Sequence, residues 1–95
     1  MEKRIGTISI LVYDKTSVAE VNRLLSEYSD FILARYGLPL PDRHLNIISI
    51  IIETSTNNIN ALTGNLGRIR DVEVKTILSK HIENENRIKT QEFHR

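Results

Sequence analysis

The chain has 95 residues, of which 40% are hydrophobic and 26% charged, a composition typical of a single globular domain. It contains no cysteine, which excludes disulfides, thiolate metal sites and cysteine nucleophiles. The net charge is +1, and residues 1–79 hold nine Lys/Arg against nine Asp/Glu, so the basic excess typical of nucleic-acid binding is missing. No apolar run approaches the roughly 20 residues that span a bilayer, and no signal peptide is recognised, so we expect a cytoplasmic location and no membrane partner.

The first third of the chain predicts a strand followed by a helix. Residues 5–13 are rich in β-branched side chains, with apolar residues at alternate positions, which is typical of a strand. Ser17-Val-Ala-Glu20 has the form of a capping box, in which the two polar side chains satisfy backbone donors at a helix start. Apolar residues then recur three and four positions apart, which predicts an amphipathic helix ending near Ser29.

The middle of the chain predicts two strands. Residues 31–36 form a short β-favouring run, and Gly-Leu-Pro-Leu-Pro at 37–41 is expected to close it and form the connection, because proline lacks an N–H donor and glycine permits positive φ. Residues 45–53 form the next strand. Six of the eight residues from Leu45 to Ile52 are apolar, so the side chains on both faces of this strand are expected to be shielded from water. The face that does not pack on the core therefore needs a second layer to cover it. This pattern favours an oligomer.

The remaining elements are a second helix and a fourth strand. Residues 54–58 offer several possible N-caps, and apolar residues from Ile59 to Ile69 then follow helical spacing. Gly67 is expected to end this helix in a left-handed cap. Residues 72–78 alternate cleanly between apolar and polar, which predicts a strand.

The order β-α-β-β-α-β predicts an α+β, ferredoxin-like sandwich, with two helices on one face of a four-stranded antiparallel sheet. The residues expected to face the helices are Ile8, Ile10, Val12, Ile48, Ile50, Ile52, Val72 and Val74. The other face is mixed, and its apolar members are the predicted oligomer interface: Leu11, Tyr13, Ile47, Ile51 and Ile77.

Two parts of the chain are distinguished by composition. Residues 1–79 are expected to form the folded domain. Residues 80–95 are polar, with few apolar residues and no clear period, and we expect a C-terminal tail that is flexible or packed on a neighbouring subunit.

Several strings of this sequence resemble the iron-only hydrogenase system regulators. They are Arg4-Ile-Gly-Thr-Ile-Ser-Ile, Arg35-Tyr-Gly-Leu-Pro with Ile47-Ile-Ser, and Ala61-Leu-Thr-Gly-Asn-Leu-Gly-Arg68 with Val72-Glu-Val-Lys-Thr76. The most specific is Leu62-Thr-Gly-x-Leu-Gly-Arg68, which a general ferredoxin-like domain does not require. The resemblance covers about residues 4–80.

The resemblance implies an ACT-like domain, similar in fold to the ligand-sensing C-terminal half of the nickel-responsive repressor. It also implies dimers or tetramers that assemble through their sheets, and it brings no catalytic residues. The chain differs from that repressor in lacking its N-terminal DNA-binding module and its nickel-site cysteine and closely spaced histidines. The likeness to the repressor is therefore one of fold.

No constellation of residues indicates a catalyst or a resident cofactor. The three histidines, His44, His81 and His94, are not spaced as a ligand set, and no phosphate loop occurs, so neither an enzyme nor a metal site is expected. Strand 45–53 carries no aromatic residue on which an RNA base would stack.

Four polar residues are candidates for binding a small molecule. Asp14 lies in the loop before the first helix, where ACT-like domains bind ligands, although it also suits an ordinary turn. Arg35 and Arg43 flank the Gly/Pro segment and are candidates to meet across a hairpin, and Arg68 follows the second helix. A solvated or dipole-complementing role is the competing interpretation for these arginines.

The sequence therefore predicts a non-enzymatic regulatory or assembly module of the iron-only hydrogenase system, acting through homo-oligomerisation and ligand sensing. Two alternatives remain open: a small-molecule or metal sensor, and an adaptor for a separate DNA-binding or enzyme partner.

Overall fold

Four strands and two helices follow one another in the predicted order in the computed structural model, which describes residues 2–80. The elements are β1 (Arg4–Val12), α1 (Val18–Glu27), β2 (Ile32–Leu40), β3 (Leu45–Thr54), α2 (Thr56–Gly67) and β4 (Val72–Leu78). Three single 3-10 turns, at Lys15–Ser17, Ser29–Phe31 and Pro41–Arg43, lie in the connections. The expected tail falls almost wholly in residues 81–95, outside the described residues.

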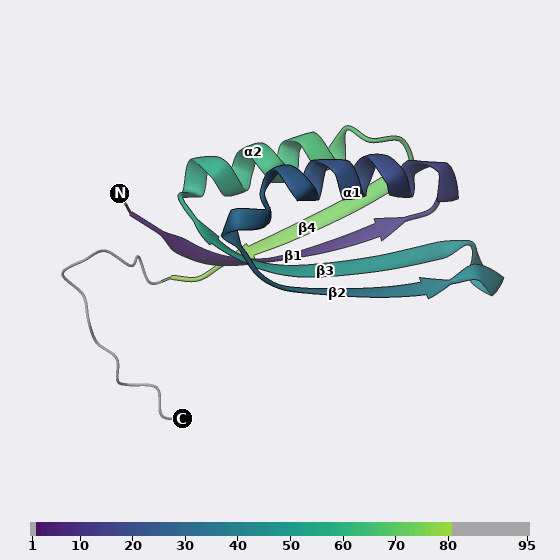
Figure 1. Cartoon of the computed structure of the whole chain (residues 1–95), viewed down its shortest axis with the longest axis horizontal. Helices are drawn as coiled ribbons and strands as arrows, with labels where there is room; N and C mark the ends of the chain where they lie inside the picture. Colours follow the sequence, from purple (N-terminus) through teal and green to yellow (C-terminus); the bar gives the residue numbers. More distant parts are fainter. Residues whose placement is uncertain (1, 81–95) are drawn as a thin grey trace, which may run out of the picture.

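The sheet has the strand order β2-β3-β1-β4, and each neighbouring pair is antiparallel. Both helices lie side by side on one face of the sheet (Figure 1). Within residues 2–80, no other element covers the opposite face. This arrangement confirms the predicted α+β fold. It also puts β2 and β4 at the two edges of the sheet.

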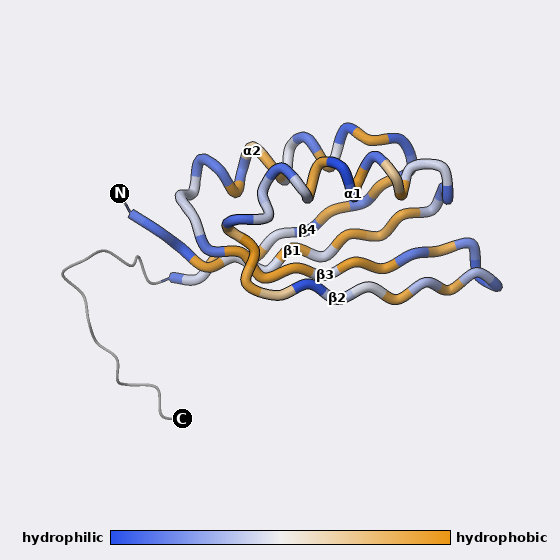
Figure 2. The backbone as a smooth tube through the Cα atoms, in the orientation of Figure 1, coloured by the Kyte–Doolittle hydropathy of each residue, from blue (hydrophilic) through white to orange (hydrophobic). Residues whose placement is uncertain are grey.

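The core lies between the helices and the sheet. Alternation along β1 and β3 sends every second side chain toward the helices, and apolar segments recur along the strands in Figure 2. The fully buried side chains include Ile8, Ile10, Val12, Ile50, Ile52, Val21, Leu25, Ile59, Leu62 and Leu66. Val72 and Val74 are partly buried against this cluster. The predicted assignment of residues to the helix-covered face is therefore correct.

The segment 37–41 is not the turn that its glycine and prolines predict. β2 continues through it to Leu40, and the chain reverses at Pro41–Arg43 and His44, whose φ of 51° is left-handed. A sheet tolerates a residue without an N–H on an edge strand, which is where Pro39 lies. The β2–β3 hairpin is consequently longer than expected and extends past the start of α1 (Figure 1).

A bulge interrupts β2 near its start. Ile32 pairs with Ile52 and Ala34 with Ile51, so Leu33 is an extra residue on β2. Ile32 packs against the core, whereas Ala34 lies opposite an open-face residue. The bulge thus allows both residues of β2 to take the side that their surroundings require.

The capping box predicted at α1 does not form. Ser17 makes no side-chain cap, and its hydroxyl instead donates to the carbonyl oxygen of Arg70 at 2.8 Å. At α2 the cap is as expected, since the Ser55 side chain accepts the N–H of Asn58 at 3.1 Å. Gly67 does not adopt positive φ, so its predicted left-handed cap is wrong.

None of the helices within residues 2–80 is long and apolar enough to cross a membrane.

Candidate functional site: the open sheet face and the hollow beside it

The sheet face turned away from the helices, called here the open face, is defined by the strand register. Its side chains form cross-strand rows, because residues paired in an antiparallel sheet point to the same side. One row is Leu38–Ile47–Leu11–Glu73, the next is Tyr36–Ser49–Ser9–Lys75, and the third is Ala34–Ile51–Thr7–Ile77. Tyr13 continues the open-face alternation of β1 one step beyond Leu11.

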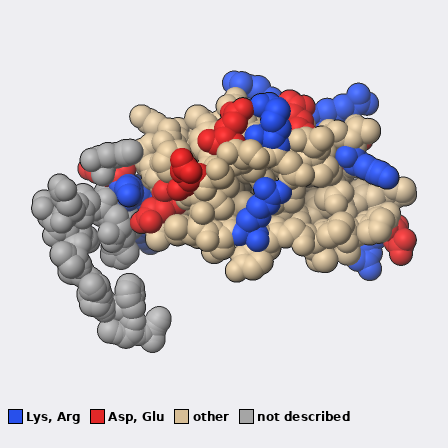
Figure 3. Space-filling view, viewed as in Figure 1, with Lys and Arg blue, Asp and Glu red and all other residues tan. Residues whose placement is uncertain are grey.

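Apolar side chains dominate this face. Tyr36, Leu38 and Ile77 are 64%, 54% and 73% exposed, although they are large and apolar. In Figure 3, charged side chains lie mainly over the helical layer and toward the ends of the molecule, and basic atoms also lie midway along the sheet layer. Exposed apolar side chains gathered on one face in this way are typical of an interaction site.

The charged side chains of the three rows lie on β4. They are Glu73 and Lys75, at the ends of two neighbouring rows. The Tyr13 hydroxyl donates a 2.8 Å hydrogen bond to Glu73 Oε1. This bond, more than partial desolvation and the carboxylate's charge, raises the pKa of Tyr13. The pair fixes one carboxylate oxygen at the margin of the open face.

A hollow lies between the start of α1 and the projecting end of the β2–β3 hairpin, and Tyr13 is part of its lining. Its volume is about 500 Å³, within the range of small-molecule sites. Tyr13, Lys15, Val18, Pro39, Pro41, His44, Leu45 and Asn46 line it. Apolar groups make up much of this lining, and Lys15 and His44 offer nitrogen donors. No carboxylate is found among the described lining residues, so the hollow favours a neutral or anionic guest.

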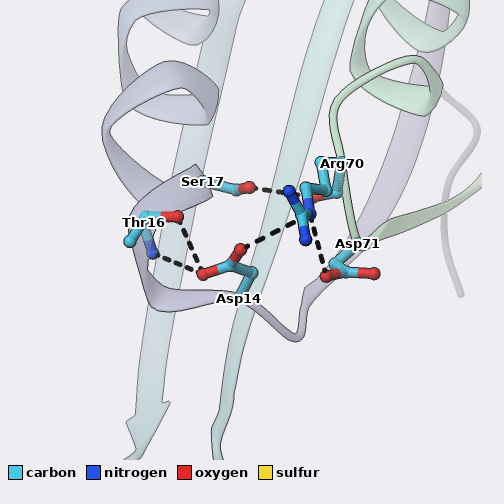
Figure 4. A network of polar contacts seen from close by, with 5 residues as sticks. All are labelled: Asp14, Thr16, Ser17, Arg70 and Asp71. Carbon is cyan, nitrogen blue, oxygen red and sulfur yellow. Dashed lines mark hydrogen bonds and ion pairs between the residues drawn. The ribbon is translucent and has the colours of Figure 1, made fainter.

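Asp14 is not among the residues that line this hollow, and its carboxylate belongs to a local network of polar contacts (Figure 4). Its Oδ1 accepts the backbone N–H of Thr16 at 2.9 Å and the Thr16 hydroxyl at 2.8 Å, and its Oδ2 lies 3.9 Å from Arg70 Nε. The backbone bond from Thr16 is the largest cause of the lowered pKa of Asp14, followed by the hydroxyl bond, with a smaller contribution from Arg70. The Asp14 carboxylate therefore stabilises the turn before α1, which is the ordinary turn role that the sequence also allowed.

The three candidate arginines do not converge. Arg35 pairs in register with the buried Ile50, lies on the helix side of the edge strand and bonds the Asn22 side chain of α1. Arg43 is exposed in the hairpin turn. Arg68 follows α2, and its Nη1 donates to Asn65 Oδ1 at 3.1 Å. With Asp14 they occupy four separate places rather than one site.

Within residues 2–80, no group of three or more metal-ligating side chains comes together. His44 is exposed at the hairpin turn, and the other two histidines, His81 and His94, lie outside the described residues.

The sequence did not predict several residues of the open face and of the hollow. Tyr36 and Leu38 join the open face because β2 continues past Gly37, and their spacing of two from Ala34 was the available signal. Lys15 and His44 meet at the hollow although 29 positions separate them in the sequence, and no local pattern indicates this.

The fold and its open face define the class: a split β-α-β-β-α-β domain with one sheet face available for contact. The chain belongs to the TM1266-like family, whose model matches residues 4–76. The role proposed for this family is that of an iron-only hydrogenase system regulator. This membership confirms the resemblance noted in the sequence, and with it the regulator class at the level of the family.

Two solved structures show the extent of similarity. The structure of the uncharacterized protein TM1266 from Thermotoga maritima is 38% identical, with a TM-score of 0.79, and the match covers 82% of this chain and 99% of that one. The divalent ion tolerance protein CutA1 from Ehrlichia chaffeensis is 15% identical, with a TM-score of 0.46 and coverage of 88% and 89%. No functionally curated protein matches the chain.

Proposed function

We propose that the chain is a non-enzymatic regulatory and assembly module of the iron-only hydrogenase system, which acts in the cytoplasm as a homo-oligomer joined through the open face. The observation that supports this proposal is the exposure of Tyr36, Leu38 and Ile77 on that face, beside the aliphatic side chains of its two central strands. Family membership supports the regulatory setting. Apolar area is the main source of association energy, so such a face favours a covered state.

The dimensions of the face suit a second copy of the chain. Four strands of seven to ten residues, at ordinary strand spacings, give a footprint of roughly 600 Å². Two copies would therefore bury about 1,200 Å² in total, the lower end of specific protein interfaces. The central side chains Leu11, Ile47 and Ile51 would lie inside that contact.

Size-exclusion chromatography with light scattering tests this proposal. We expect a dimer or tetramer at micromolar concentration, and a dissociated mass for Ile51→Lys, which buries a charge at the centre of the contact. Ala61→Lys, on the exposed side of α2, is the matched control and should keep the oligomer mass. Circular dichroism establishes that both variants fold. A monomeric unmodified chain, or an Ile51→Lys variant of unchanged mass, would contradict the proposal.

Ligand sensing at the hollow is a second candidate function. It is favoured by a lining that combines an apolar floor with Lys15 and His44, and by Tyr13, which belongs to both the hollow and the margin of the open face. The ligand class that fits is a small carboxylate with an apolar body, because the carboxylate would accept from the nitrogen donors.

Amide NMR titration with benzoate and short-chain carboxylates checks this second function. Shifts should concentrate at residues 13–18 and 39–46, and Lys15→Ala should abolish them. Lys3→Ala, at the opposite end of β1, is the charge-matched control. Shifts spread evenly over the domain, or unchanged in Lys15→Ala, would remove the hollow as a site.

A further inference from the structure

We infer that two copies meet open face to open face about a two-fold axis that runs along the strands, so that β4 of one copy lies over β2 of the other. This inference rests on the proposed association and adds its geometry. It comes from the uneven distribution of side chains across the face.

The two edges of the open face differ in chemistry. Lys75 and Glu73 stand on β4, whereas the opposite edge strand, β2, carries Tyr36 and Leu38. Between them, β1 and β3 contribute aliphatic and small hydroxyl side chains. The face is therefore charged along one edge and aromatic and aliphatic along the other.

An axis along the strands preserves each row and reverses its direction. In the middle row, Lys75 of each copy then lies over Tyr36 of the other, where the ammonium group can approach the aromatic ring. In the third row, the strongly exposed Ile77 lies over the small Ala34. In the first row, Glu73 lies over Leu38 at the rim of the contact, where the carboxylate stays in water and keeps its bond from Tyr13. The middle and third rows are therefore the ones in which the two edges are complementary, in charge or in size.

An axis across the strands gives a worse match. With such an axis through the middle row, which is the placement that overlaps all three rows, each strand would lie over its own copy, and Lys75 would directly oppose Lys75 of the other subunit. The aromatic edge would be stacked on itself, and no positive group would face the Tyr36 ring. Repulsion between like charges across a contact disfavours this arrangement.

The absence of cysteine from the chain makes the geometry directly testable. Two single variants, Tyr36→Cys and Lys75→Cys, are mixed and treated with a short bis-maleimide, because facing sheets lie about 10 Å apart, beyond the roughly 7 Å reach of a disulfide. In the inferred dimer, like positions are offset sideways by about three strand spacings, about 14 Å. The mixture should thus yield several-fold more cross-linked dimer than either variant alone. Ala34→Cys with Ile77→Cys is a second pair with the same expectation.

Light scattering on the unmodified chain and on each variant separates the outcomes. Efficient cross-linking of Lys75→Cys alone, or of Tyr36→Cys alone, would overturn the inferred axis. A dimeric mass for the variants without cross-links in either mixed pair would also overturn it, while leaving association through the sheet in place. A monomeric unmodified chain would overturn the association and the inference together.

Discussion

The hydroxyl of Ser17 donates a 2.8 Å hydrogen bond to the carbonyl oxygen of Arg70, across 53 positions of the chain. Ser17 is buried at the start of α1, and Arg70 lies in the loop that leads into β4. The backbone N–H of Tyr13 bonds the Asp71 carbonyl oxygen at 2.9 Å in the same place. The two loops at this end of the sheet are thus held together next to the hollow.

Ser17→Ala should lower the free energy of unfolding by about 1–2 kcal/mol, because it leaves a partly buried carbonyl without its donor. Urea unfolding measures this change. Ser26→Ala is the matched control, since its hydroxyl makes a comparable bond to the Asn22 carbonyl oxygen at 3.1 Å, but on an exposed helix surface. Equal losses in the two variants would show that the long-range bond contributes nothing special.

Glu73→Gln should lower the pKa of Tyr13, because the carboxylate acceptor of its hydroxyl is the main cause of the raised value. Since the folded pKa lies above the ordinary 10.0, the bond contributes stability that is fully present below about pH 10 and is lost as pH rises through the folded pKa. NMR titration of the Tyr13 ring measures the shift. Glu53→Gln, at the other end of the sheet, should leave the Tyr13 titration as it is.

Asp14→Asn should weaken the domain at neutral pH and lose this effect in acid. The folded pKa of Asp14 lies below its ordinary 3.8, so the ionised group contributes stability that is present above about pH 4 and is lost as pH falls through the folded pKa. Thermal unfolding of both proteins across pH 2–7 follows the difference. Thr16→Val, which removes only the hydroxyl donor, should give a smaller loss, and Thr16→Ser should restore the bond. A pH-independent difference would argue against a role for the charge.

Gly6→Val should destabilise the domain by about 1–3 kcal/mol through overpacking. A Cβ at Gly6 already meets Leu78 Cδ2 at 3.3 Å and Ile59 Cδ1 at 3.4 Å, and the two methyl groups of valine reach further into the core. Gly37→Val is the control, because a Cβ there meets no heavy atom of the described chain within 4 Å. Equilibrium denaturation compares the two. A Gly6→Val protein as stable as Gly37→Val would show that α2 moves aside at little cost.

Periodicity was sufficient to predict the fold and the buried side of the sheet. Alternating isoleucines in residues 5–13 and 45–53 assign one face to the core, since a shift by one residue would bury Thr7, Ser9 and Ser49 instead. The predictions that were wrong concern features that depend on tertiary contacts. The Ser17–Glu20 pattern is locally a capping box, but the Ser17 hydroxyl donates its hydrogen bond to a carbonyl oxygen from the other half of the chain. The Gly/Pro segment resembles a turn, and only its place on an edge strand makes Pro39 acceptable.

The surfaces were less predictable than the core. Arg35 and Arg43 are near each other in sequence, but the extension of β2 separates them, and Arg35 turns to the helix side. The hollow depends on the overhang of the hairpin past α1, a length that residue types alone do not specify. Sequence spacing therefore indicates which residues share a strand face, and says little about which loops meet.

The unequal edges of the sheet limit how copies of this chain can polymerise. Head-to-tail growth of a sheet requires the β4 edge of one molecule to pair with the β2 edge of the next. The β2 edge offers such a partner a ladder broken by the bulge at Leu33 and by the missing donor of Pro39, whereas β4 pairs with β1 in unbroken register. A head-to-tail fibril of this isoleucine-rich chain is consequently disfavoured at every joint.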